Sequence, residues 1–184
     1  KTEELNIKNI EYLQADILQL KKLDKKFDII ESSGVLHHMK DPIAGLKVLL
    51  DLLEPNGFLK LGLYSKIGRR HIVEAREVFN KKNVKNINKD FKIFRQEIIN
   101  EKKDLEYRKL VLNEDFYSLS GLKDLLFHVQ EYCFTIPEIS KMLNNLNLKF
   151  IGFYVSDNFI KNKYSKLYPD DEKNISLNNW HQFE

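Results

Sequence analysis

The sequence predicts an α/β fold in which a parallel sheet is interrupted by a helical insertion. Short apolar runs bounded by polar residues are typical of buried parallel strands, and a helical leucine pattern lies between two of these runs. Residues 67–134 differ, since they are poor in glycine, rich in charge and amphipathic. Alternation of strand and helix on either side of such a stretch indicates a parallel sheet with an inserted helical segment.

Residues 1–66 are expected to form the first part of the sheet. Their apolar runs predict strands at Ile10–Ala15, Phe27–Glu31 and Phe58–Leu63. A helix is predicted between the last two strands, because Asp41 can cap it and Pro42 suits the first helical position. The motif "EPNGF", residues 54–58, ends this helix with Pro and Gly.

Residues 67–134 predict three or four helices, with Ser120 a possible cap of the last one. The α/β pattern resumes over residues 135–156. There, Thr135 and Glu138 have the spacing of a capping box, and the motif "LKFIGFYV", residues 148–155, predicts a strand after the helix. Residues 157–184 predict an irregular polar tail with one apolar anchor, Trp180.

The composition limits the classes of function. The 184 residues suffice for one domain with a real core, and 42% of them are hydrophobic. The net charge is only +3, with 27 acids interspersed among 30 bases, so no nucleic-acid partner is expected. Apolar runs are too short to predict a membrane span, and the polar N-terminus shows no signal peptide. A single cysteine permits no internal disulfide, which favours a cytoplasmic location.

The order of four segments resembles the class I S-adenosylmethionine-dependent methyltransferases. The segments are "LQADILQL", "FDIIESSGVLHHMKDP", "GLKVLLDLLEPNGFLKLGLYS" and "IPEISKMLNNLNLKFIGFYV". This resemblance implies an incomplete Rossmann-like methyltransferase sheet made of strands 3, 4, 5 and 6 of the family order. Three further stretches, "LYSKIGRRHIVEAREVF", "LLFHVQEYCFTIPEI" and "LNNWHQFE", resemble a bacterial subgroup sometimes fused to tetratricopeptide-type repeats. Together the resemblances cover nearly all of residues 10–184.

One family motif has no counterpart here. The seven glycines form no glycine-rich "D-G-x-G-x-G" loop, and the family places strands 1 and 2 between strands 3 and 4. The resemblance therefore implies a fragment, inactive alone, that binds S-adenosylmethionine weakly or not at all. Because unpaired strand edges are prone to associate, three outcomes are open for strand 3: direct pairing with strand 4, edge-to-edge pairing of two chains, or irregular packing. Of these we expect either a homodimer, formed through strand edges or the helical insertion, or the direct pairing.

The resemblance implies cofactor contacts at two strand ends. Asp16 and Ile17 would lie near the adenine, and Ser32, Ser33 and Gly34 would lie over the methionine part of the cofactor. Independently, small residues at the carboxyl end of a parallel strand allow a ligand to approach the backbone closely. An ordinary turn at each place is the alternative interpretation.

His37 and His38 follow this turn. A metal site is not predicted, because adjacent side chains diverge and no further ligands complete a set. The resemblance places the pair at the acceptor edge, where one histidine would act as general base. The alternative is a core or helix-start histidine that makes a hydrogen bond.

Candidate acceptor contacts lie farther along the chain. Tyr64 ends a predicted strand on the ligand side, and Arg70 belongs with Arg69 and Arg76 to a cluster suited to carboxylate or phosphate. The alternatives are a core tyrosine and a solvated helix face.

Asp124 and His128 are four residues apart on a predicted helix, so they share one face. A carboxylate there would raise the histidine pKa and orient the ring, which makes His128 a candidate base. The alternative is a surface pair.

Taken together, these patterns predict a fragment of an S-adenosylmethionine-dependent methyltransferase. Methyl transfer from a sulfonium is an in-line displacement that depends mainly on proximity and alignment, so the sequence does not specify the methyl acceptor. A non-catalytic, methyltransferase-like interaction or dimerisation module is the alternative.

Overall fold

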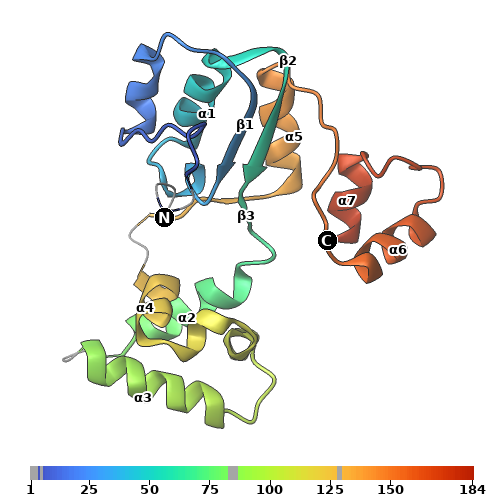
Figure 1. Cartoon of the computed structure of the whole chain (residues 1–184). Coiled ribbons are helices and arrows are strands. Elements are labelled where there is room, and N and C mark those ends of the chain that lie inside the picture. Colours follow the sequence, from blue (N-terminus) through green and yellow to red (C-terminus); the bar gives the residue numbers. More distant parts are fainter. Residues whose placement is uncertain (1–3, 5, 83–86, 128–129) are drawn as a thin grey trace. The chain divides into compact units, whose positions relative to one another are not determined.

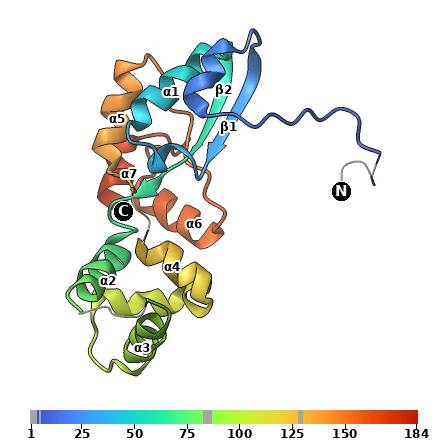
Figure 2. The same ribbon diagram turned by 90° about the vertical axis from the view of Figure 1, so that its left-hand side faces the viewer.

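The structure is a computed structural model that describes residues 4, 6–82, 87–127 and 130–184. It divides into two compact units, Lys1–Gly62 and Leu63–Glu184, which are treated separately below. Both units combine small parallel sheets with many helices (Figures 1 and 2). No helix in the described ranges is both long and apolar enough to cross a membrane.

The first unit contains a two-stranded parallel sheet. Strand β1 (Phe27–Ser33) pairs with β2 (Leu53–Gly62), and helix α1 (Pro42–Asp51) connects them and lies beside the sheet (Figures 1 and 2). Asp41 caps α1 as predicted, because its Oδ1 accepts hydrogen bonds from the backbone N–H groups of Ile43 and Ala44. The buried leucines of this helix form the core of the unit.

The predicted stop at "EPNGF" forms an irregularity inside β2. Pairing passes from Phe27 opposite Leu53 to Ile29 opposite Phe58, so the intervening residues of β2 turn out of the ladder. Asn56 has a φ of 66°, a left-handed conformation that asparagine tolerates better than most residues. Regular pairing then runs to Ser33 opposite Gly62.

The predicted strand Ile10–Ala15 is wrong. These residues are extended but exposed and belong to no sheet, and they lead into a 3₁₀ helix, η1 (Ile17–Lys22). A strand requires a partner for its backbone N–H and C=O groups, and no described strand pairs with this segment. The predicted direct pairing of family strands 3 and 4 is wrong for the same reason.

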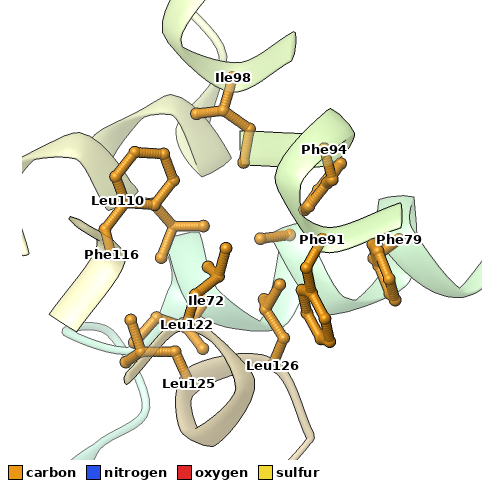
Figure 3. Close-up of a cluster of buried hydrophobic side chains, with 11 residues drawn as sticks. Ile72, Phe79, Phe91, Phe94, Ile98, Leu110, Phe116, Leu122, Leu125 and Leu126 are labelled. Carbon is orange, nitrogen blue, oxygen red and sulfur yellow. The ribbon is translucent and has the colours of Figure 1, made fainter. Parts of the chain in front are cut away.

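The second unit contains a helical region with its own hydrophobic core. Its elements are α2 (Arg70–Asn80), α3 (Ile87–Asn100), η3 (Glu106–Leu112), η4 (Glu114–Tyr117) and α4 (Leu119–Phe127). Figure 3 shows their apolar side chains converging, with Phe79 stacked on Phe91 at 4.7 Å between ring centroids. Ser118, rather than the predicted Ser120, accepts a hydrogen bond from the N–H of Gly121 at the start of α4.

After the helical region, β4 (Cys133–Phe134) pairs in parallel with β3 (Tyr64–Ser65). Helix α5 (Ile136–Asn145) follows, and its predicted capping box is confirmed. Thr135 Oγ1 accepts a hydrogen bond from the N–H of Glu138, while the Glu138 carboxylate accepts one from the N–H of Thr135.

The end of the chain differs from its prediction in two ways. Residues 148–155 form no strand, because their backbone pairs with no described strand. The tail is not irregular but forms α6 (Asn158–Leu167) and α7 (Leu177–Phe183). Trp180 is the expected anchor, and it stacks on a second, fully buried aromatic, Tyr164, at 3.8 Å. At this end of the chain, contacts between aromatic rings take the place of the strand pairing that the apolar pattern of residues 148–155 suggested.

Candidate functional site

The carboxyl ends of β1 and β2 meet at one edge of the first unit. Ser33 pairs with Gly62, and the position where a Gly62 Cβ would stand lies 3.0 Å from three atoms of Ser33. A larger residue at position 62 would therefore crowd Ser33, and glycine avoids this contact. The next residue on the first strand's side, Gly34, has a φ of +75° and open space where a side chain would lie, with nothing within 4 Å. At this edge the two strands therefore lie close together, while the space beside Gly34 in the turn is open.

Ser32 and Ser33 differ in their surroundings. The Ser32 side chain is buried, and its Oγ has no hydrogen-bond partner among the described residues. Ser33 Oγ donates to Glu31 Oε1 at 3.2 Å, and the same carboxylate forms an ion pair with Lys60 at 2.8 Å. The Lys60 ammonium lowers the pKa of Glu31, first through its hydrogen bond and then through its charge. The end of β1 thus carries two serine hydroxyls, and that of Ser33 lies beside the Glu31 carboxylate, whose charge is paired with Lys60.

His37 is a core histidine in this structure. Its ring is only 1% exposed, and Nδ1 lies 3.2 Å from the carbonyl oxygen of Gly62. This contact joins the turn after β1 to the end of β2. His38 is half-buried, and its ring packs edge-on against His37 at 4.2 Å. No group of three or more potential metal ligands occurs in the described part of the chain.

Asp16 and Ile17 lie at the start of η1 in the same unit. Asp16 is exposed, and its Oδ1 accepts a hydrogen bond from the N–H of Leu18 at 2.8 Å, so it caps the short helix. Ile17 is half-buried. The turn-forming interpretation of Asp16 matches this geometry, and its adenine contact stays a prediction.

In the second unit, the three arginines of the predicted cluster do not lie together. Arg69 and Arg76 both contact the Glu131 carboxylate, whose side chain is 2% exposed, with Arg76 Nη1 at 2.5 Å from Oε2. The Arg69 guanidinium also lies over the Tyr64 ring, 3.9 Å from its centroid. Arg70, in contrast, is exposed at the start of α2. Sequence reasoning grouped the arginines but did not connect Glu131 to them, because it lies 55 or more positions away.

The predicted Asp124–His128 pair is only half described. Asp124 is exposed on α4, and His128 lies outside the described residues. Their proposed interaction therefore stays a prediction.

The structure also contains a cavity that sequence reasoning did not predict. It has a volume of about 570 Å³ in the second unit and is lined by His71, Lys109, Leu112, Asn113, Glu114 and Asp115. Burial lowers the pKa of His71, a shift that the Glu106 carboxylate opposes. His71 lies in the helix "RRHIVEAREVF" beside the arginines, but nothing in its spacing distinguished it from a surface residue.

Comparison with known proteins agrees with the fold of the first unit. Residues 1–59 match a family model described as a methyltransferase domain. An uncharacterized protein of Synechococcus sp. is 38% identical over 68 residues, which cover 37% of this chain but only 16% of that protein. The match thus spans about a sixth of the relative's length. The segment over residues 1–59 is therefore part of a methyltransferase-type domain, as its motif order predicted.

Proposed function

We propose that the first unit contributes half of the S-adenosylmethionine site of a methyltransferase, and that a glycine-rich segment of the kind the family uses supplies the other half. The observation that supports this most directly is the paired carboxyl ends of β1 and β2, in the stretch that matches the methyltransferase domain model. Open α/β sheets bind ligands outside this edge. That the whole protein transfers a methyl group to an acceptor is part of the same proposal.

The residues at this edge fit such a cofactor. Gly34 leaves open space above the turn, and Ser32 Oγ is a buried polar atom without a partner among the described groups. When bound, S-adenosylmethionine supplies an activated methyl group on a sulfonium. Ser32, Ser33 and Gly34 would line its methionine part, and Asp16 and Ile17 its adenine.

His37 and His38 have different roles in this proposal. Since His37 is enclosed and bonded to the Gly62 carbonyl, its role is to hold the turn against β2. His38 is the more exposed of the two and is the candidate to take a proton from an acceptor. His128, Tyr64, Arg70 and Asp124 stay candidates for the acceptor side.

Calorimetry with S-adenosylmethionine tests the proposal. The 184 residues extended upstream by a "D-G-x-G-x-G" segment, read from the coding DNA before Lys1, should bind, and the 184 residues alone should bind weakly or not at all. Gly34→Val should abolish binding by filling the open space. Gly152→Val is the matched control, because Gly152 also has a positive φ, +136°, with nothing within 4 Å of the added Cβ.

Two outcomes contradict the proposal. One is the absence of heat with the extended chain. The other is equal binding by the Gly34→Val and Gly152→Val variants. Micromolar affinity for the 184 residues alone would instead refute the view that half of the site is missing.

A second candidate function, a non-catalytic interaction module, is favoured by the outer face of the β1–β2 sheet. Phe27, Ile29 and Phe58 lie on this face and are 39%, 68% and 57% exposed. A homodimer formed through this sheet would cover them. In the coding DNA upstream of Lys1, a start codon that is not followed by a glycine-rich segment would favour the module over the enzyme.

A further inference from the structure

The second unit contains a buried group of charges that do not balance. It consists of Arg69 and Arg76 around the single carboxylate of Glu131. The arginine side chains are 13% and 18% exposed, and the Glu131 side chain is 2% exposed. Two guanidinium groups therefore share one carboxylate in a largely desolvated place, and guanidinium groups keep their charge at any ordinary pH. The cluster carries one positive charge in excess.

Hydrogen bonding in this cluster is also incomplete. Arg76 Nε donates to the carbonyl oxygen of Leu125 at 2.8 Å, and Arg69 Nη2 donates to Glu131 Oε1. Arg69 Nε and Arg76 Nη2, however, are buried donors without a hydrogen-bond partner in the described part of the chain. Glu131 Oε2 is likewise close to Arg76 but makes no hydrogen bond. Leaving a buried donor on a charged group unsatisfied is costly.

Further charges nearby do not remove the imbalance. The charges that act on the Cys133 thiol are Glu131, Arg69, Arg76 and Lys66, and Lys66 also acts on the Glu138 carboxylate, so the excess is the single positive charge of the buried cluster. Tyr64, stacked under Arg69, adds an aromatic wall but no formal charge. An excess positive charge in a desolvated place is stabilised by an anion, and paired guanidiniums suit the planar oxygens of carboxylate or phosphate.

We propose that Arg69 and Arg76 form an oxyanion-binding site that Glu131 compensates only in part, and that its ligand bears a carboxylate or phosphate group. The ligand oxygens accept hydrogen bonds from the guanidinium donors that Glu131 leaves unsatisfied. The small exposed fractions of both arginines place the site next to the surface of this unit. The proposal does not depend on methyl transfer.

The sole cysteine gives a local readout of the site. Cys133 is half-buried, and burial, followed by the Glu131 charge, raises the pKa of its thiol, while the surrounding cations oppose this rise. An anion bound at the cluster would weaken the effect of these cations and slow reaction of the thiol with iodoacetamide, a neutral reagent. The experiment measures this rate while inorganic phosphate or acetate replaces chloride at constant ionic strength. The two anions distinguish a phosphate from a carboxylate ligand.

The proposal predicts saturable slowing with at least one of the two anions. Arg70→Gln, an exposed neighbour on the same helix, should retain this response, whereas Arg69→Gln/Glu131→Gln, which removes one charge of each sign, should lose it. Glu131→Gln alone removes the competing carboxylate and should tighten anion binding about tenfold or more. A purely structural ion cluster predicts the opposite for Glu131→Gln, namely lower stability with no gain in anion response.

Three results would overturn the proposal. They are a rate that does not respond to either anion, a response that the double variant retains, and a Glu131→Gln variant that binds anions no better than the parent. Because phosphate stabilises many proteins by exclusion from their surface, an unsaturable rise in melting temperature does not count as support.

Discussion

The helical region of the second unit and the sheet of the first unit bury their apolar residues very differently. In the helical region, α2, α3, α4 and the 3₁₀ helices enclose a core whose members are at most 5% exposed. In the sheet of the first unit, by contrast, large apolar side chains such as Ile29 are exposed. The helical region therefore has a closed core, while the sheet leaves apolar area exposed.

Physical reasons for this difference lie in the elements themselves. A helix satisfies its backbone hydrogen bonds internally, so a few helices can enclose a core without other parts of a protein. Parallel strands require neighbours on both edges and layers on both faces, and a two-stranded sheet rarely meets these needs. The comparison indicates that the helices enclose their own core, whereas the two-stranded sheet of the first unit leaves large apolar side chains exposed.

Substitutions at Ile98 and Ile99 test the closed core most sharply. The two residues are adjacent in α3, but Ile98 is fully buried and Ile99 is 44% exposed. Ile98→Ala should lower the free energy of unfolding by about 2–5 kcal/mol through lost burial and a cavity. The matched change Ile99→Ala should cost less than about 1 kcal/mol. Urea unfolding followed by far-UV circular dichroism measures both, and equal costs would show that the core is not closed as described.

A comparison of Asp171 and Asp170 tests the aromatic cluster of the tail. Asp171 accepts hydrogen bonds from the Tyr164 hydroxyl at 2.5 Å and from the N–H groups of Ile175 and Ser176, at 3.1 and 2.9 Å. Asp171→Asn removes the charge from these bonds and should cost about 1–3 kcal/mol. The exposed neighbour Asp170 provides the control, Asp170→Asn. Fluorescence of the single tryptophan, Trp180, follows the loss, since its ring stacks on Tyr164.

Local signals in the sequence predicted the local structure well. The Asp41 cap, the Thr135–Glu138 capping box and the strand from Phe27 all appear as expected, because each depends on residues a few positions apart. The parallel sheet expected from the order of strands and helices is also confirmed in part, since the register pairs the strands from Phe27 and Phe58 in parallel.

Errors arose where a segment's structure depends on distant partners. The apolar patterns of residues 10–15 and 148–155 suit strands, but neither has a paired strand in the described residues. The pairing of Glu131 with Arg69 and Arg76 was not predicted for a similar reason, because the two arginines lie more than 50 positions earlier in the chain. The sequence did not predict the tail helices α6 and α7. Their surfaces are polar, and the pattern of residues did not reveal the aromatic stack of Tyr164 on Trp180.

The capping box at the start of α5 provides a smaller test with a pH dependence. Thr135→Ala removes one of its hydrogen bonds and should cost about 1 kcal/mol, whereas Thr135→Ser should cost little. Hydrogen bonds from the Thr135 backbone and side chain lower the pKa of Glu138. The ionised carboxylate is thus favoured by folding, and its contribution is complete above the ordinary carboxyl pKa and is lost as pH falls below that value. Thermal unfolding from neutral to acidic pH should show a shallower acid decline for Glu138→Gln, and an unchanged decline would contradict the assignment.

The smallest expected effect on stability concerns the outer face of the sheet, where Ile29 is 68% exposed. If this face is open in the monomer, Ile29→Lys should change the free energy of unfolding by no more than about 0.5 kcal/mol, because little apolar area is lost. The same charge should disperse a dimer formed through this sheet, since a second copy would have to bury it. Sedimentation equilibrium on the parent and the variant measures association, and Asn162→Lys, which adds the same charge at an exposed position on α6, controls for a change in net charge alone. A large loss of stability without any change in association would instead show that another part of the same chain covers Ile29, and the contrast between an open sheet and a closed helical core would then fail.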